Sequence, residues 1–196
     1  RFQENPGRNH WNAVKRILRY LKGTQDLNLT YQKSQLVERV EGFSDSDYAG
    51  DIDTRRSTTG YVFKLASGSI TWKSKIQQTV ALSSTEAEYM SIASATQEAL
   101  WLRNIAIEIK FIKDHEPIKI FEDNRGAIAL TKNPGNHQRS KHIDVKYHFV
   151  REKVHEKKII VDWMESEKMV ADILTKPLPK EKFIRLRDQL GLVSLN

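Results

Sequence analysis

The order of apolar and polar positions predicts a chain of alternating strands and helices. Apolar residues that recur every three or four positions predict helices, and short β-branched or aromatic runs between turn residues predict strands. The predicted strands are residues 27–31, 38–45, 60–65, 69–73, 118–121 and 158–163. The predicted helices are residues 9–21, a long helix that opens at Ser83, and residues 124–131, 143–156, 167–175 and 182–190. The last five strands and their helices predict an α/β fold in which a mixed five-stranded sheet carries helices on both faces.

Turn and linker residues divide the chain into three parts. A polar stretch at residues 32–35 separates the first helix and strand from the rest, so we expect a boundary near residue 36. Pro177 and Pro179 end the last part of the sheet domain, because proline stops a helix. We therefore expect one domain at residues 36–176, preceded by residues 1–35 and followed by an amphipathic tail at residues 177–196.

The composition narrows the possible functions. Lysine and arginine number 32 against 25 acids, a formal charge of +7 that favours a polyanionic partner such as nucleic acid. The sequence has no cysteine, which excludes disulfides, thiolate zinc sites and cysteine nucleophiles. No apolar run approaches the ~20 residues of a membrane span. We expect an intracellular chain that, beginning at Arg1 without methionine or signal peptide, is a piece of a longer polypeptide.

Four acidic residues fall at strand ends or on helices, and they are the candidates for chemistry. They are Asp45, Glu88, Asp123 and Asp172. Four carboxylates gathered at one point can hold two divalent cations that cut a phosphodiester with water. Oxygen-only ligands suit Mg²⁺, with Mn²⁺ as a possible substitute, rather than zinc.

Helical spacing identifies Glu88 as the strongest of the four candidates. One core-facing stripe of the long helix comprises Glu88, Ile92, Ala95, Ala99, Leu102, Ala106 and Ile109. On this spacing Glu88 is the one acid on the buried face, whereas Glu86 forms a capping box with Ser83. A buried carboxylate needs compensation, either from a cation or from a paired lysine or arginine.

The three aspartates each have an ordinary structural alternative. Asp45 ends a strand on the same face as Phe43, but aspartate is also common in turns. Asp123 follows an apolar strand where a helix begins, and it is free for binding if Asn124 caps that helix. Asp172, on the flank of a short apolar stripe, could be a solvated helix residue.

Several motifs together resemble one known family. They are Phe43-Ser44-Asp45-Ser46-Asp47-Tyr48-Ala49-Gly50-Asp51, Arg55-Arg56-Ser57-Thr58-Thr59-Gly60-Tyr61, Ser83-Ser84-Thr85-Glu86-Ala87-Glu88-Tyr89, Glu122-Asp123-Asn124, Lys141-His142-Ile143-Asp144 and Ala171-Asp172-Ile173-Leu174-Thr175-Lys176-Pro177-Leu178. They resemble the ribonuclease H domain at the end of the Pol polyprotein of copia-type (Ty1/copia) LTR retrotransposons. The resemblance covers nearly the whole chain.

The resemblance implies the ribonuclease H fold and hydrolysis of the RNA strand of RNA–DNA hybrids with two Mg²⁺ ions. It assigns the acidic set to Asp45, Glu88, Asp123 and Asp172, and residues 1–35 to the C-terminal remnant of a reverse transcriptase or connection segment. The chain has no Asp-Asp pair, so the polymerase would lie upstream. The family members with the best studied mechanism carry a histidine in a loop shortly before the last aspartate, and none occurs between Trp163 and Asp172, so the resemblance implies no such histidine role here. The implied location is a cytoplasmic virus-like particle with possible nuclear access.

Basic residues in predicted loops and strand ends are the candidates for nucleic-acid contacts. They are Lys73, Lys75, Arg139, Lys141 and His142. Charged loops are often only solvated, which is the ordinary alternative. Two other functions remain open: a catalytically silent domain that binds the hybrid or supports the polymerase, and a DDE-type integrase. In an integrase the glutamate comes last, whereas here Glu88 precedes Asp123.

Overall fold

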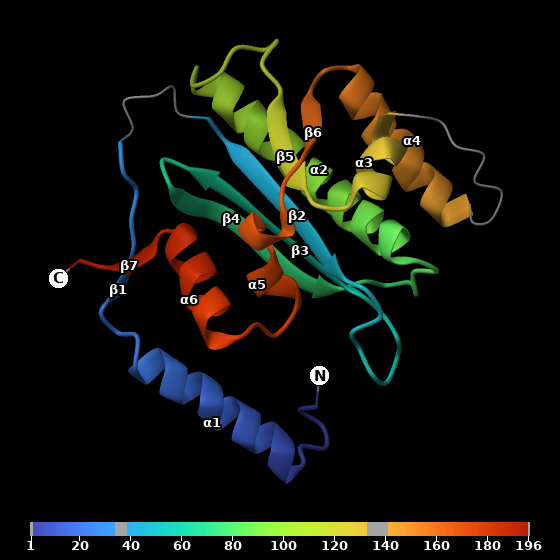
Figure 1. Cartoon of the computed structure of the whole chain (residues 1–196). Helices are drawn as coiled ribbons and strands as arrows, with labels where there is room; N and C mark the ends of the chain where they lie inside the picture. The colour runs from blue at the N-terminus through green and yellow to red at the C-terminus, as the bar shows by residue number, and fades with distance from the viewer. Residues whose placement is uncertain (1, 34–38, 133–140, 196) are drawn as a thin grey trace.

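The computed structural model describes residues 2–33, 39–132 and 141–195, with the backbone alone described for residues 141–144. A five-stranded sheet forms its centre (Figure 1). In spatial order the strands are β4 (Gly68–Ile76), β3 (Thr58–Leu65), β2 (Glu41–Asp47), β5 (Ile118–Glu122) and β6 (Ile159–Trp163). The first three pair antiparallel, and β5 and β6 add in parallel, which confirms the predicted mixed sheet.

Helices cover both faces of the sheet, as predicted (Figure 1). On one face lie α2 (Ser84–Glu108), α3 (Arg125–Lys132) and α4 (Lys141–His155), and on the other lie α5 (Asp172–Thr175) and α6 (Lys180–Gln189). Strand alternation supplies a separate apolar cluster for each face. Phe63 and Ile120 pack with the α2 side, whereas Phe43 and Val62 pack with Met169 and Leu186 on the other.

The prediction of one continuous helix at residues 167–175 is wrong. A 3-10 turn at Ser166–Lys168 (η1) is followed by an irregular segment, and α5 begins only at Asp172. Met169, Val170 and Ala171 are all buried in succession. Met169 has an extended backbone (φ −69°, ψ 97°), which interrupts the helix between η1 and α5.

Two short strands, one from the N-terminal part of the chain and one from the C-terminal part, form a second, smaller sheet. Strand β1 (Leu27–Leu29) pairs antiparallel with β7 (Leu192–Ser194), and the latter was not predicted from the sequence. Helix α1 (Arg8–Lys22) lies apart from the central sheet (Figure 1), and its apolar residues Trp11, Ile17 and Leu21 are more than half exposed. Among the described helices, none combines the length and apolarity that a membrane span requires.

Candidate metal centre

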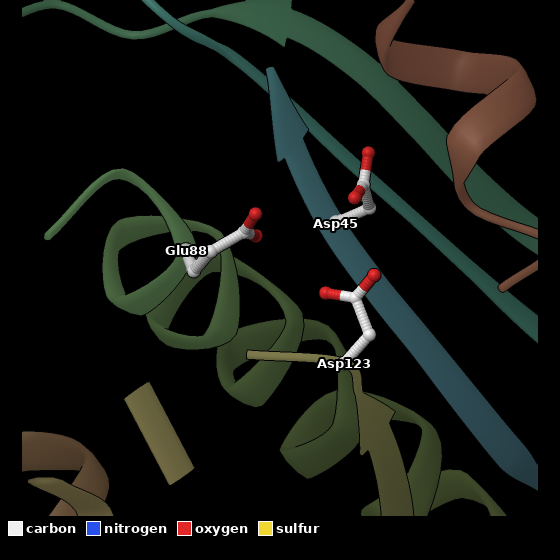
Figure 2. Close-up of side chains that lie close together, drawn as sticks. All are labelled: Asp45, Glu88 and Asp123. Carbon is white, nitrogen blue, oxygen red and sulfur yellow. The ribbon is translucent and has the colours of Figure 1, made fainter. Parts of the chain in front are cut away.

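Three carboxylates from separate elements converge at one end of the sheet. Asp45 of β2, Glu88 of α2 and Asp123 after β5 each offer an oxygen, and these oxygens all lie within 4.8 Å of one another. Their side chains point toward a common space (Figure 2). The structure thus brings together three of the four acids selected from the sequence.

The sheet register places both aspartates at this point. The parallel pairing of β2 with β5 ends at Phe43 and Phe121, so Asp45 and Asp123 each lie two residues beyond the last pair. Asn124 accepts a hydrogen bond from the Ala127 N–H (3.0 Å) and so caps α3, as expected. Asp123 is therefore not needed as a cap.

The start of α2 positions Glu88. Ser83 accepts a hydrogen bond from the Glu86 N–H (3.1 Å), and the Glu86 carboxylate accepts one from the Leu82 N–H (2.9 Å). Glu86 therefore has the predicted capping role, but it is buried as well, so the prediction that Glu88 is the only acid on the buried face is wrong. The prediction for Ile109 is also wrong, because it lies at the exposed end of the helix.

Burial makes the charged forms of two carboxylates costly. Desolvation raises the pKa of Asp45 to about 7, although the Lys176 ammonium and a hydrogen bond from Thr175 oppose the shift. Desolvation and the charges of Asp45 and Asp123 raise the pKa of Glu88 to about 9. Among the described residues, the buried Oε2 of Glu88 has no hydrogen-bond partner. An unsatisfied oxygen beside two other carboxylates fits a hard divalent cation, which would neutralise the charge and complete the coordination.

The fourth candidate, Asp172, lies outside this cluster. It is the first residue of α5 and its exposed fraction is 1%. Its two oxygens are paired with lysine ammonium groups, Oδ1 with Lys176 Nζ at 2.8 Å and Oδ2 with Lys182 Nζ at 2.8 Å. Lys176 Nζ is also 3.4 Å from Asp45 Oδ1, so one lysine connects Asp172 to the three-acid cluster. Lysine pairing was the expected alternative for Glu88, and it occurs at Asp172 instead.

A fifth carboxylate, Glu122, was missed by the sequence analysis. It ends β5 with no exposed surface, and its Oε1 accepts a hydrogen bond from the Asn124 N–H (3.2 Å). Burial, followed by the charge of Glu88, raises its pKa well above the usual range. Strand alternation could have found it, because Ile118, Ile120 and Glu122 share the buried face.

Two of the predicted nucleic-acid residues lie on one surface. Lys73 and Lys75 of β4 line a cavity of 430 Å³ between the sheet, α2 and α4, where Lys146 joins them. Lys146 could not be predicted from the sequence, because its position on α4 is close to β4 only in three dimensions. Arg139 lies outside the described residues, and Lys141 and His142 are described only as backbone at the start of α4.

The fold is that of ribonuclease H-like proteins. It aligns with LC11-RNase H1, isolated from compost by a metagenomic approach, at a TM-score of 0.51 and 12% identity, covering 75% of this chain and 96% of that one. No protein-family model matches the chain.

Sequence comparison places the chain more narrowly. It is 42% identical over 194 residues to the retrovirus-related Pol polyprotein from transposon TNT 1-94 of Nicotiana tabacum, and 39% identical over 194 residues to that from transposon RE2 of Arabidopsis thaliana. Each alignment covers 99% of this chain but only 14% and 13% of the respective polyproteins. The chain belongs to the copia-type Pol polyprotein family and spans about one seventh of the length of these relatives.

Proposed function

We propose that this chain is the ribonuclease H part of a retrotransposon Pol polyprotein and that it hydrolyses the RNA strand of RNA–DNA hybrids. The convergence of Asp45, Glu88 and Asp123 at the sheet end carries this proposal. The ribonuclease H-like fold and the Pol relatives support it. On this view an upstream reverse transcriptase is the partner of the chain, residues 1–35 are its C-terminal remnant, and residues 177–196 are a tail of the nuclease domain.

The acidic residues of the site would have two roles: four of them would bind cations, and Glu122 would limit the negative charge near them. Asp45, Glu88 and Asp123 would hold one Mg²⁺ or Mn²⁺ ion through oxygen ligands, and Asp172 together with Asp45 would hold a second. When bound, such ions supply Lewis-acid chemistry at the scissile phosphate. Burial and the charge of Glu88 raise the pKa of Glu122, which favours its protonated form and so limits the negative charge near the site. The enclosed position of Asp45 and Glu88 excludes bulk water from these ligands.

The direct test is cleavage of a labelled hybrid by the isolated chain. With Mg²⁺ we expect the RNA strand to be cut and the DNA strand to stay intact, and with a chelator we expect no cleavage. A duplex of DNA should not be cut, because it lacks the 2′-hydroxyls that an A-like hybrid displays in its minor groove. If the Mg²⁺-loaded chain binds the hybrid but leaves RNA uncut, the silent hybrid-binding domain is the better assignment.

The lysine-lined cavity predicts a strong effect of salt on hybrid binding. Replacing Lys73 and Lys75 together with glutamine should weaken binding and flatten the dependence of log K on log salt by about 1.8, since each phosphate contact contributes about 0.9. Fluorescence anisotropy at several salt concentrations measures this slope. Lys113→Gln is the control, because Lys113 is exposed in the loop before β5, at the opposite end of that strand from the carboxylates. An unchanged slope in the double variant would remove these lysines from the interface.

A further inference from the structure

The ammonium group of Lys176 lies between two buried carboxylates of the site. We propose that Lys176 is a built-in cation that occupies the place of a second divalent ion between Asp45 and Asp172, and that a second ion binds only by displacing it. This inference rests on the proposed function, because it assumes that the three-acid cluster holds the first ion. It assigns to Lys176 control of how many ions the site holds.

The contacts of Lys176 fit this role. Its Nζ is 2.8 Å from Asp172 Oδ1 and 3.4 Å from Asp45 Oδ1. A divalent ion that bridges these two oxygens by direct coordination would lie about 2–2.6 Å from each. The ammonium group already fills that gap, so the two cations cannot bind there together.

The position of Lys176 after α5 allows its side chain to move away from the two aspartates. Lys176 follows α5 directly and stands four residues after Asp172, which places both side chains on one side of the helix turn. Its side chain is 39% exposed, whereas that of Asp172 is 2% exposed. The flexible lysine stem can therefore turn into solvent while the aspartate stays in place.

Lys182 completes the arrangement from α6. Its Nζ is 2.8 Å from Asp172 Oδ2 and is not within ion-pair distance of Asp45 in the described structure. When the Lys176 side chain moves into solvent, Asp172 remains paired with Lys182, so its buried charge is not left without a partner. The two lysines thus differ in the second acid that each contacts. Lys176 bridges Asp172 and Asp45 of the three-acid cluster, whereas Lys182 pairs with the other oxygen of Asp172 and, at 3.9 Å, with the exposed Glu167.

This arrangement predicts unequal ion sites. The first ion enters the three-acid cluster, where Glu88 Oε2 has no hydrogen-bond partner among the described residues. The second must compete with a charge that is covalently attached and always present. The second site should therefore fill only at a higher concentration of the free ion.

Calorimetric titration with Mn²⁺ alone tests this on the wild type, Lys176→Met and Lys182→Met. Methionine keeps most of the apolar stem and removes the charge. We expect the wild type to bind a first ion and a second at least tenfold more weakly. Lys176→Met should tighten the second site at least tenfold and the first by a smaller factor, because Asp45 also belongs to the first site. Lys182→Met, which removes the same charge from the other oxygen of Asp172, should tighten the second site less than threefold.

The outcomes separate this inference from the proposed function. Equal tightening in both variants would overturn the inference, because it would show a general effect of charge instead of competition for one place. A first site that binds normally with a second site unaffected by Lys176→Met would also overturn it and leave the metal centre standing. Failure of every variant to bind Mn²⁺ would overturn both.

A measurement on the unaltered chain does not depend on the folding of the variants. Acetylation of lysines by a soluble N-hydroxysuccinimide ester, read by mass spectrometry, reports whether an ammonium group is engaged. The rate at Lys176 should rise at least threefold over the Mn²⁺ range that fills the second site, and the rate at Lys182 should not. A constant rate at Lys176 across that range would contradict displacement.

Discussion

Asp123→Asn should lower the rate of RNA cleavage at least a thousandfold and leave the fold intact. Asparagine keeps the shape of the side chain and removes the charge that a cation in the three-acid cluster needs. Loss of about 4 kcal/mol of transition-state stabilisation, the scale of a metal ion acting as a Lewis acid, corresponds to about a thousandfold. Asp123 is only half-buried and Asn124 caps α3 in its place, so little stability should be lost. Single-turnover cleavage of a hybrid labelled on the RNA strand measures the rate.

The matched control is Asp53→Asn. Asp53 is an exposed aspartate in the loop between β2 and β3, and the same change of charge there should alter the rate less than twofold. Thermal unfolding of all three proteins checks that the fold is kept. Cleavage by Asp123→Asn at more than a tenth of the wild-type rate would show that Asp123 is not needed to hold a catalytic ion.

The metal-free chain should lose stability as the pH rises from about 5 to 9, and Mg²⁺ should reverse the loss. The folded-state pKa of Asp45, about 7, and that of Glu88, about 9, exceed their ordinary values of 3.8 and 4.5. The folded state therefore holds protons that the unfolded state has released, and its stability is full below about pH 4 and falls until each folded pKa is passed. One such proton is worth about 1.4 kcal/mol per pH unit. For a chain of this size, the melting temperature should fall by on the order of 10 °C between pH 5.5 and 8.5.

Added Mg²⁺ should remove most of this fall, because the ion replaces the protons on the same carboxylates and stabilises the folded state by mass action. Glu122→Gln provides a second check. Glutamine mimics the protonated Glu122 carboxyl at every pH. The stability of this variant should therefore fall less steeply with pH, by up to about 1.4 kcal/mol per pH unit, the contribution of one proton. Differential scanning calorimetry across this range measures both effects. A metal-free melting temperature that rises with pH would mean that Asp45 and Glu88 are not buried together.

Much of the fold and part of the site could be predicted from local patterns. The helical spacing from Glu88 to Ala106 placed Glu88 toward the sheet, and all the residues of that stripe up to Ala106 are buried. Strand patterns placed Asp45 and Asp123 each at the end of a strand, and these inferences depend only on the periods of helices and strands. That the two strands are parallel neighbours, which brings the two aspartates together, is shown by the structure.

The parts that were missed depend on contacts between distant segments. The pairing of Asp172 with Lys182 joins α5 to α6, and nothing in the spacing of the two residues shows that both oxygens of the aspartate are engaged. The contact of Lys176 with Asp45 joins residues 131 positions apart. Glu122 was different, since extending the strand by one residue would have placed it on the buried face with Ile120.

The small sheet of β1 and β7 fixes the C-terminal end of α6, which follows α5 and Asp172 along the chain. Thr30 donates a backbone hydrogen bond to Gly191 O (2.8 Å), and Ser69 donates one to Leu190 O (3.1 Å), so the C-terminal segment is tied both to the N-terminal strand and to the edge of the main sheet. Helix α6, which supplies Lys182, lies between α5 and β7 along the chain. The residues of β7 thus help to hold α6, and with it the Lys182 contact to Asp172 beside the metal centre. Removing β7 should therefore disturb Asp172, although the two do not touch.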